Sequence, residues 1–268
     1  MYKAVFVDVD GTLIKSDHTV SEPTKQTIQQ LIENKILVVL VSARPIDGIL
    51  PISKRIGTLD LPIASLNGGY IVLNNEVIFE SHIDLSIVSQ LHEQLMAYGV
   101  TLLYYQQNEC FAEIRNKHVE KEQKVTKVPV VIQPFADTLN QWKIKQRGPN
   151  KILIISTPDA VRKMQKTLTA QYGDTLNICS SKPSYLEIMN SAASKTNAIK
   201  FLLNKYGLKR EEIIVIGDNF NDKEMIEFGG MGIAMGNAPA EVKAAANFVT
   251  DTNNNDGVHK ALLKFMVL

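Results

Sequence analysis

The sequence is short of cysteine, of long apolar runs and of net charge, and each shortage excludes a class of protein. Its two cysteines, Cys110 and Cys179, are too few for a disulfide framework and offer no Cys-x-x-Cys metal or redox spacing, so we expect them to be structural. The sequence contains no run of about 20 apolar residues, which is the length needed to span a bilayer. The 29 basic and 28 acidic residues leave a net charge of +1, so no overall field attracts nucleic acid or an anionic membrane. Any anion site must therefore be local.

Several targeting and catalytic motifs are also missing. The N-terminus runs directly into an apolar segment without a signal peptide, which favours a cytoplasmic protein. Neither Gly-x-x-x-x-Gly-Lys-Ser nor Gly-x-Ser-x-Gly occurs, and the five histidines lack metal-ligand spacing. The glycines at 229, 230, 232 and 236 follow a predicted helix rather than a strand, so they indicate a packed strand and not a dinucleotide site.

What the chain does have is an even alternation of helix and strand signals. With 268 residues and 45% hydrophobic content, it can bury one large core or two smaller ones. The alternation predicts an α/β protein. Near Ile83 the order of predicted helices and strands changes, which predicts a second unit inserted into the first. We expect a parallel-sheet core formed by residues 1–82 and 186–268 and an α+β insert formed by residues 83–185.

The first candidate site follows the first predicted strand. Residues 2–7 are mostly apolar and lead into Asp8-Val9-Asp10-Gly11, a pattern typical of a strand covered on both faces. Asp8 and Asp10 are two residues apart, so an extended backbone directs both carboxylates to the same side, and Gly11 allows an immediate turn. Because unpaired buried charge is costly, two such acids imply a cation or a proton; a solvated turn is the plainer alternative.

The next elements complete a strand-helix-strand unit. Residues 36–41 form a continuous branched strand that ends at Ser42. The crossover of such a unit is right-handed and makes its strands parallel, so Asp8 and Ser42 are expected at the same edge of the sheet. A third predicted strand, residues 61–66, ends at Asn67, which precedes two glycines.

The insert is predicted to mix helices with antiparallel strands. Residues 84–98 have the pattern of an amphipathic helix, and residues 100–105 and 110–114 alternate as two paired strands. A charged run, residues 117–127, is typical of a solvated face. The parallel pattern is expected to resume near Tyr185.

A second acidic turn strengthens the interpretation of the first. Residues 213–216 form a clear apolar strand and lead into Gly-Asp-Asn-Phe-Asn-Asp at 217–222. Two parallel strands then carry acids to their carboxyl ends, which is where open sheets bind ligands. The four carboxylates at positions 8, 10, 218 and 222 would face one obvious ammonium group, Lys195, so a hard divalent cation is required. Oxygen-only ligands favour Mg2+ or Ca2+ over zinc.

Together these motifs resemble those of the haloacid dehalogenase-like hydrolases, and within them the Cof-type phosphatases with a large cap. Four motifs match in order and nearly span the core: Asp8-Val9-Asp10-Gly11-Thr12, Ser42, Lys195 and Gly217-Asp218-Asn219-Phe220-Asn221-Asp222. The resemblance implies a Rossmann-like core, and it makes the insert a cap on grounds of length and element order. Two positions depart from the family pattern, since Ala43 and Thr196 stand where the family commonly has glycine.

The chemistry of phosphoryl transfer gives the charged residues roles. Asp8 can attack a phosphomonoester and form an aspartyl phosphate that water then hydrolyses. Asp10 is the expected general acid and base, with a pKa raised by the surrounding carboxylates. Lys195 would hold the transferring phosphate oxygens as a point charge. Asp8 and Asp218 would bind Mg2+, and the resemblance adds the backbone carbonyl of Asp10 as a further ligand.

The remaining residues are expected to bind or to position other groups. Ser42 and Asn221 would help the lysine to hold the phosphate oxygens. Asp222 would orient the lysine or a water of the metal. Arg44 and Asn67 are candidate substrate contacts, although Asn67 is equally well explained as a turn residue.

The expected function is a Mg2+-dependent phosphatase of small phosphorylated metabolites, either sugar phosphates or phosphorylated cofactors such as flavin mononucleotide or pyridoxal phosphate. The cap would choose among them and close over the site. We expect no nucleic-acid or membrane partner and a monomer or small homo-oligomer. Two alternatives stay open: a phosphosugar mutase using the same aspartyl phosphate, and a catalytically silent regulator that binds a phosphorylated metabolite.

Overall fold

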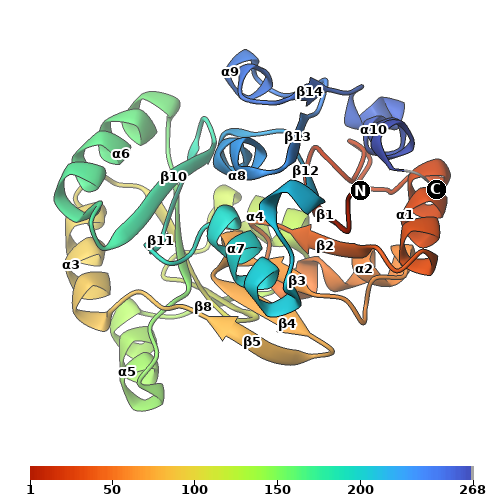
Figure 1. Ribbon diagram of the computed structural model, residues 1–268. Helices are drawn as coiled ribbons and strands as arrows, with labels where there is room; N and C mark the ends of the chain where they lie inside the picture. The colour runs from red at the N-terminus through yellow and green to blue at the C-terminus, as the bar shows by residue number, and fades with distance from the viewer. Residues whose placement is uncertain (267–268) are drawn as a thin grey trace.

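Two β-sheets and the helices around them make up the fold (Figure 1). The computed structural model describes residues 1–266. Within these residues, the strands of the larger sheet come from both ends of the chain, whereas those of the smaller sheet come from one continuous middle segment. No helix within residues 1–266 is both long and apolar enough to cross a membrane.

The larger sheet is the predicted parallel core. In spatial order its strands are β14 (Phe248–Val249), β13 (Met231–Ala234), β12 (Ile213–Gly217), β1 (Ala4–Asp8), β2 (Leu37–Val41), β3 (Ile63–Ser65), β4 (Tyr70–Leu73) and β5 (Glu76–Glu80). The six strands from β14 to β3 run parallel, and β4 and β5 form an antiparallel hairpin at one edge. The strands with the acidic turns, β1 and β12, are therefore neighbours.

Helices cover both faces of this sheet, which explains its continuous apolar runs. Val5 and Val7 of β1 pack on one side, and Ala4 and Phe6 pack on the other. The helices of the first side are α1 (Glu22–Glu33), α2 (Leu50–Ile56) and α10 (Gly257–Phe265); those of the second are α7 (Lys195–Tyr206) and α8 (Lys223–Phe228). A short helix, α9 (Ala240–Ala244), lies near β13. The predicted α/β fold class is confirmed.

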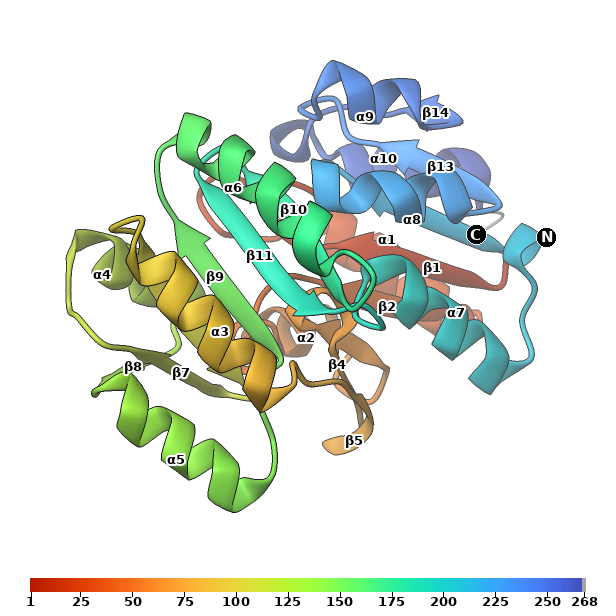
Figure 2. The same cartoon turned by 90° about the vertical axis from the view of Figure 1, so that its left-hand side faces the viewer.

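The smaller sheet is mostly antiparallel. Its spatial order is β10 (Leu176–Lys182), β11 (Tyr185–Asn190), β9 (Lys151–Ile155), β6 (Thr101–Gln106), β7 (Glu109–Ala112) and β8 (Val130–Ile132). Three helices pack on its outer face around one apolar cluster: α3 (Leu85–Met96), α5 (Phe135–Lys145) and α6 (Pro158–Tyr172). Figure 2 shows α3 and α6 lying across this face. The insert thus has its own sheet and its own core.

The inner face of the smaller sheet packs against the larger unit. Leu103, Tyr105 and Leu153 of the smaller sheet share one apolar cluster with Ile46 and Ile49, which follow β2. The smaller unit therefore lies over the loops at the carboxyl ends of the core strands. We call the unit from α3 to β11 the cap.

The predicted boundaries of the insert need one correction. The first, between residues 82 and 83, falls between the end of β5 and the start of α3. The second is predicted after residue 185, but β11 pairs with β10 and β9, so the cap sheet continues to Asn190. The sequence misleads here because a buried apolar strand has the same pattern in either sheet.

The charged run at 117–127 is also different from the prediction. It forms helix α4 (Lys117–Thr126), and one side of this helix is buried. Val119 is fully buried, and Glu122 is only 7% exposed. The prediction of a solvated face was wrong for that side, because a single buried carboxylate cannot be recognised among many exposed ones.

Candidate active site

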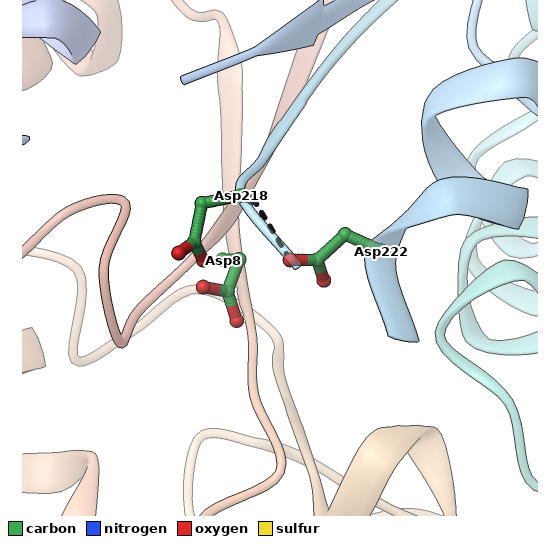
Figure 3. Close-up of side chains that lie close together, drawn as sticks. All are labelled: Asp8, Asp218 and Asp222. Carbon is green, nitrogen blue, oxygen red and sulfur yellow. Dashed lines mark hydrogen bonds between the residues drawn. The ribbon is translucent and has the colours of Figure 1, made fainter. Parts of the chain in front are cut away.

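Three aspartates meet where the parallel strands β1 and β12 end. Asp8 is the last residue of β1, Asp218 directly follows β12, and Asp222 closes a short 3-10 turn, η4 (Phe220–Asp222). One carboxylate oxygen of each lies within 4.8 Å of the others, and Figure 3 shows Asp222 pointing toward the other two. The two acidic turns thus lie side by side, as the pairing of β1 with β12 requires.

Lys195, the first residue of α7, brings an ammonium group to this cluster. Its Nζ lies 2.6 Å from Oδ1 of Asp8 and 2.5 Å from Oδ1 of Asp222, and the side chain is buried. Burial lowers the pKa of Lys195, but Asp222 and Asp8 outweigh it and hold the pKa above its ordinary value. The lysine is therefore charged, and one of its three N–H groups is left for another acceptor.

The acids carry more negative charge than this lysine balances. Burial, and after it the neighbouring Asp222, raises the pKa of Asp8 well above its ordinary value, although Lys195 opposes the shift. Burial and the same neighbour raise the pKa of Asp218 to about 7. A divalent cation would remove this repulsion, so the oxygen-only cluster fits a metal such as Mg2+.

Asp222 differs from the other two acids in its hydrogen bonds. Its Oδ1 accepts from Lys195, and its Oδ2 accepts from the backbone N–H groups of Asp218 and Asn219, each at 3.0 Å. Both oxygens are therefore engaged in holding the lysine and the turn after β12. This arrangement suits a positioning residue better than a metal ligand.

The turn after β1 holds Asp218 in place. Thr12 donates its hydroxyl to Oδ1 of Asp218 at 3.3 Å, and Asn237 donates its amide to Oδ2 at 3.1 Å and to the carbonyl of Gly11 at 2.9 Å. Gly11 has a φ of +81°, and a Cβ at this position would lie 2.3 Å from Oδ2 of Asp218. Glycine is required here both by the backbone conformation and by the close approach of the carboxylate.

Asp10 has a different environment from the one that the sequence predicts. Arg44 donates from Nε to Oδ2 at 2.6 Å and from Nη2 to Oδ1 at 2.7 Å, and its Nη1 donates to the carbonyl of Gly48. Burial raises the pKa of Asp10, but the two bonds from Arg44 outweigh it and lower the pKa below its ordinary value. The predicted rise in the pKa was wrong because the guanidinium, and not the other carboxylates, is the dominant neighbour.

Three of the four predicted phosphate or substrate contacts, Ser42, Asn67 and Asn221, lie around the same loops. The Ser42 hydroxyl accepts the N–H of Arg44 at 3.2 Å and is buried. Asn67 has a φ of 54° and so forms the turn, while its side chain accepts from Asn221 at 3.2 Å and donates to Glu187 of the cap. Asn67 therefore forms the turn, and its side chain is engaged by Asn221 and Glu187; its role as a substrate contact stays a prediction. Arg44, predicted as a substrate contact, is engaged with Asp10.

A cavity between core and cap contains this chemistry. The residues that line it are Asp8, Asp10, Ala43, Arg44, Asp218, Asn219, Asn221 and Asp222 from the core and Glu122, Val125, Thr126, Lys151, Ser181, Lys182, Tyr185 and Glu187 from the cap. Ser42, Asn67 and Lys195 are buried and are not among the lining residues, although Lys195 directly contacts Asp8 and Asp222 of the wall. The sequence named none of the cap residues.

Two of the cap residues join the cap to the core. Lys151, the first residue of β9, donates to the carbonyl of Ala43 at 2.7 Å and lies 3.4 Å from Glu187 on β11. Glu187 in turn accepts from Asn67 of the core and from Ser181 at 2.5 Å. A sequence signal for this pair does exist, because each is a charged residue within an apolar strand and buried charges are paired.

The fold and the cavity together define a capped α/β protein with a charged site: acids at the carboxyl ends of parallel strands, a lysine among them, and a second unit that covers the site. Residues 5–262 match the model of the haloacid dehalogenase-like hydrolase family. A crystal structure of a haloacid dehalogenase-like hydrolase from Bacteroides thetaiotaomicron is 31% identical, with a TM-score of 0.86 over 99% of this chain and 100% of that chain.

Two curated relatives agree with this match. A Haemophilus influenzae protein named "Putative phosphatase" is 39% identical over 262 residues, which cover 96% of each chain. A Bacillus subtilis protein named 5-amino-6-(5-phospho-D-ribitylamino)uracil phosphatase is 27% identical over 270 residues, which cover 98% of this chain and 97% of its own. The chain therefore belongs to the haloacid dehalogenase-like hydrolase family and is an enzyme of that family. The resemblance drawn from four short motifs is confirmed.

Proposed function

We propose that the protein is a Mg2+-dependent phosphatase that hydrolyses small phosphomonoesters through an aspartyl phosphate on Asp8. The observation that carries the proposal is the position of Asp8, a buried carboxylate on the wall of a capped cavity, held by Lys195 at 2.6 Å. The names of the relatives from Haemophilus influenzae and Bacillus subtilis, both phosphatases, support it.

In the first step Asp8 is the nucleophile. Lys195 binds Oδ1 and fixes the carboxylate, so that Oδ2 is the oxygen that attacks phosphorus. The new P–O bond forms as the ester P–O bond breaks, and the leaving oxygen takes a proton from Asp10. The third N–H of Lys195 donates to a phosphate oxygen. The Ser42 hydroxyl, which accepts from the backbone, keeps its own hydrogen for a second phosphate oxygen.

In the second step water attacks the phosphorus of the aspartyl phosphate. Asp10 accepts the proton of this water, and the Asp8 carboxylate is released together with inorganic phosphate. Arg44 keeps Asp10 oriented and favours its ionised, proton-accepting form. A bound phosphate adds negative charge beside Asp10 and so favours the protonated form that the first step uses.

The metal fits the same residues. Mg2+ would be held by the carboxylates of Asp8 and Asp218 and the backbone carbonyl of Asp10, and when bound it offsets the repulsion between Asp8 and the phosphate. The raised pKa values of both carboxyls support this assignment. Asp222 stays with Lys195 and the turn after β12, which keeps the lysine at the correct distance from Asp8.

The cap sets the substrate class. Its side of the cavity carries several polar side chains, among them Glu122, Lys151, Ser181 and Glu187. We propose sugar phosphates or phosphorylated cofactors as substrates, and the ribityl chain in the name of the Bacillus subtilis relative supports a hydroxyl-rich leaving group. Asn221 would bind the phosphate from the core side, since its amide is already oriented by Asn67.

The test is the hydrolysis of p-nitrophenyl phosphate by the metal-stripped protein with and without added Mg2+. Activity should require Mg2+, and Asp8→Asn should lower kcat by at least about 1,000-fold because it removes the nucleophile. Asp60→Asn, at an exposed aspartate, is the matched control and should behave as wild type. A wild-type rate in Asp8→Asn would rule out Asp8 as the nucleophile. Transfer of the phosphate to an added sugar, instead of release as inorganic phosphate, would identify a mutase.

A further inference from the structure

The cap side of the cavity holds a carboxylate that the proposed chemistry does not use. Glu122, on helix α4, is 7% exposed and lines the cavity together with Asp8 and Asp10. Burying a carboxylate is costly unless a cation or several hydrogen-bond donors surround it. The partners of Glu122 therefore indicate what kind of group this part of the cavity accommodates.

Glu187, the other buried glutamate of the cavity, already has such partners. It lies 3.4 Å from the ammonium group of Lys151 and accepts hydrogen bonds from Ser181 and Asn67. Lys151 also bonds to the carbonyl of Ala43 in the core, and the bond from Asn67 is itself a contact between core and cap. Glu187 is thus engaged in the contact between the two units.

Glu122 has only neutral donors. Its Oε1 accepts the hydroxyl of Tyr105 at 3.1 Å, and its Oε2 accepts the hydroxyl of Tyr185 at 3.2 Å. Among the ion pairs within 4.0 Å in residues 1–266, none includes Glu122. Lys182 also lines the cavity, but it is exposed and its Nζ lies over the ring of Tyr185, 4.9 Å from the centroid. Arg44 also attracts Glu122, but its guanidinium is bonded to Asp10 and to the carbonyl of Gly48 and forms no ion pair with Glu122. The negative charge of Glu122 is therefore not balanced by an ion pair of its own.

The two tyrosines orient the carboxylate of Glu122 but do not use all of its capacity to accept hydrogen bonds. Each carboxylate oxygen accepts two hydrogen bonds, so one position on each oxygen of Glu122 is open. Burial, more than any neighbour, raises the pKa of both Tyr105 and Tyr185, so their hydroxyls are donors at every physiological pH. Glu122 thus faces the cavity as a preoriented acceptor.

The location of α4 identifies the part of the substrate that meets Glu122. A Cβ on Gly48 would lie 2.8 Å from the carbonyl of Thr126, so the end of α4 packs directly against Gly48. The carbonyl of Gly48 accepts from Arg44, which holds Asp10. The leaving oxygen must face Asp10 to receive its proton, so the rest of the leaving group extends toward this side of the cap.

We propose, on the basis of the phosphatase function above, that Glu122 is a specificity-determining residue that binds a hydrogen-bond donor on the leaving group of the substrate. The donor is a hydroxyl or a protonated amine, two sources of the same chemistry. A leaving group with a second negative charge is disfavoured, because it would meet a carboxylate without an ion pair of its own at short distance.

The test compares four phosphomonoesters as substrates of wild type and Glu122→Gln. They are p-nitrophenyl phosphate, whose leaving group has no donor, ribitol 5-phosphate with hydroxyls, ethanolamine phosphate with an ammonium group, and phosphoglycolate with a carboxylate. Glutamine keeps the size of the side chain and one acceptor oxygen, so it removes the charge with little change in packing. Glu120→Gln, at an exposed position on the same helix, is the control.

We expect kcat/KM of Glu122→Gln to fall by about 10-fold to 100-fold for the ribitol ester, the ethanolamine ester or both, because hydrogen bonds to charged groups are the stronger ones. The ester that loses most identifies the source of the donor. The rate with p-nitrophenyl phosphate should change by less than about two-fold, and the rate with phosphoglycolate should be unchanged or higher. Glu120→Gln should match wild type throughout.

Three results would overturn the inference. An equal fall for all four esters would show a structural role, and equal rates for both proteins would show that Glu122 does not contact the leaving group. A wild-type enzyme that hydrolyses p-nitrophenyl phosphate but neither donor-bearing ester would show that the site does not select donors. Failure of wild type to hydrolyse any ester would instead refute the phosphatase function itself, and the inference with it.

Discussion

Asp10 and Asp218 are the same amino acid and line the same cavity, yet their pKa values shift in opposite directions. Arg44 binds both oxygens of Asp10 and lowers its pKa, although burial acts in the other direction. Burial and Asp222 raise the pKa of Asp218 to about 7. At the scale of residues, the immediate partners of each carboxyl decide its charge: a neighbouring cation favours the ionised form, and burial beside another acid favours the protonated form.

Asp218 makes the stability of the metal-free protein depend on pH. Its pKa is raised to about 7 in the folded chain, above the value of about 4 expected when unfolded. Such a group contributes stability that is fully present below the unfolded pKa and is lost as the pH rises through the folded pKa. We therefore expect the metal-free protein to melt at a lower temperature at pH 8 than at pH 5.5. Each kcal/mol lost from the free energy of unfolding should lower the melting temperature by roughly 2–4 °C. Mg2+ binds the ionised form, so it should raise the melting temperature more at pH 8.

Thermal unfolding in EDTA and in Mg2+ at both pH values measures this effect. Asp218→Asn cannot ionise and should reduce the difference between the two pH values in EDTA, whereas Asp174→Asn, at an exposed aspartate, should leave it unchanged. A Mg2+-induced rise of equal size at pH 5.5 and pH 8 would contradict the prediction.

The sequence predicts which residues approach each other better than it predicts their electrostatics. The positions of Asp8 and Asp218 follow from the ends of two apolar strands, because adjacent parallel strands carry their ends to one edge. The pairing of Asp10 with Arg44 depends on the path of the loop after β2, which no periodicity describes. The same limit hides Glu122, whose burial depends on the placement of a whole helix.

At the scale of elements, the turn after β1 is constrained both by its backbone conformation and by a close contact. Gly11 combines a φ of +81° with a position where a Cβ would lie 2.3 Å from Oδ2 of Asp218. Gly207, at the end of α7, has a φ of +65° but no atom within 4 Å of such a Cβ. A substitution at Gly207 therefore measures the cost of the backbone conformation alone, and one at Gly11 adds the cost of the contact with Asp218.

We expect Gly207→Ala to lower the free energy of unfolding by about 1–2 kcal/mol, the cost of a left-handed conformation with a side chain. Gly11→Ala should lower it further and should also weaken the stabilisation by Mg2+, because Asp218 must move away. Urea unfolding with and without Mg2+ measures both effects. If the two variants lost the same amount and responded equally to Mg2+, the contact with Asp218 would be of no consequence.

The elements themselves were predicted well where burial is complete. The strands β1, β2 and β12 are short apolar runs with helices on both faces, and such runs permit few alternatives. The strand β11 was assigned to the wrong sheet because its apolar pattern reports burial and not the neighbours that bury it. Helix α4 was taken for a solvated face because half of its residues are charged.

At the scale of the whole molecule, cap and core are joined by polar contacts next to the active site. Lys151 of the cap donates to the carbonyl of Ala43 at 2.7 Å, between Ser42 and Arg44 in the chain. Glu187 of the cap accepts from Asn67 of the core. We propose that these contacts form when the cap closes and that they hold the loop carrying Arg44, and through Arg44 the carboxyl of Asp10.

Removal of the ammonium group should therefore favour the open arrangement of the cap. We expect Lys151→Met to raise KM for p-nitrophenyl phosphate by about 10-fold, because a hydrogen bond from a charged donor is worth about 1.5–3 kcal/mol and apparent affinity falls with the closed population. Hydrogen exchange in residues 42–48 should become faster. Lys163→Met, at an exposed position on α6, is the control for loss of a positive charge.

Lys151→Met also leaves Glu187 buried without its cation, which by itself destabilises a protein. The double variant Lys151→Met with Glu187→Gln removes that penalty but not the lost contact with Ala43. If the contact closes the cap, the double variant should recover thermal stability while KM stays high and exchange in residues 42–48 stays fast. Recovery of KM together with stability would show instead that the lysine serves only to neutralise Glu187, and that other contacts hold the cap over the site.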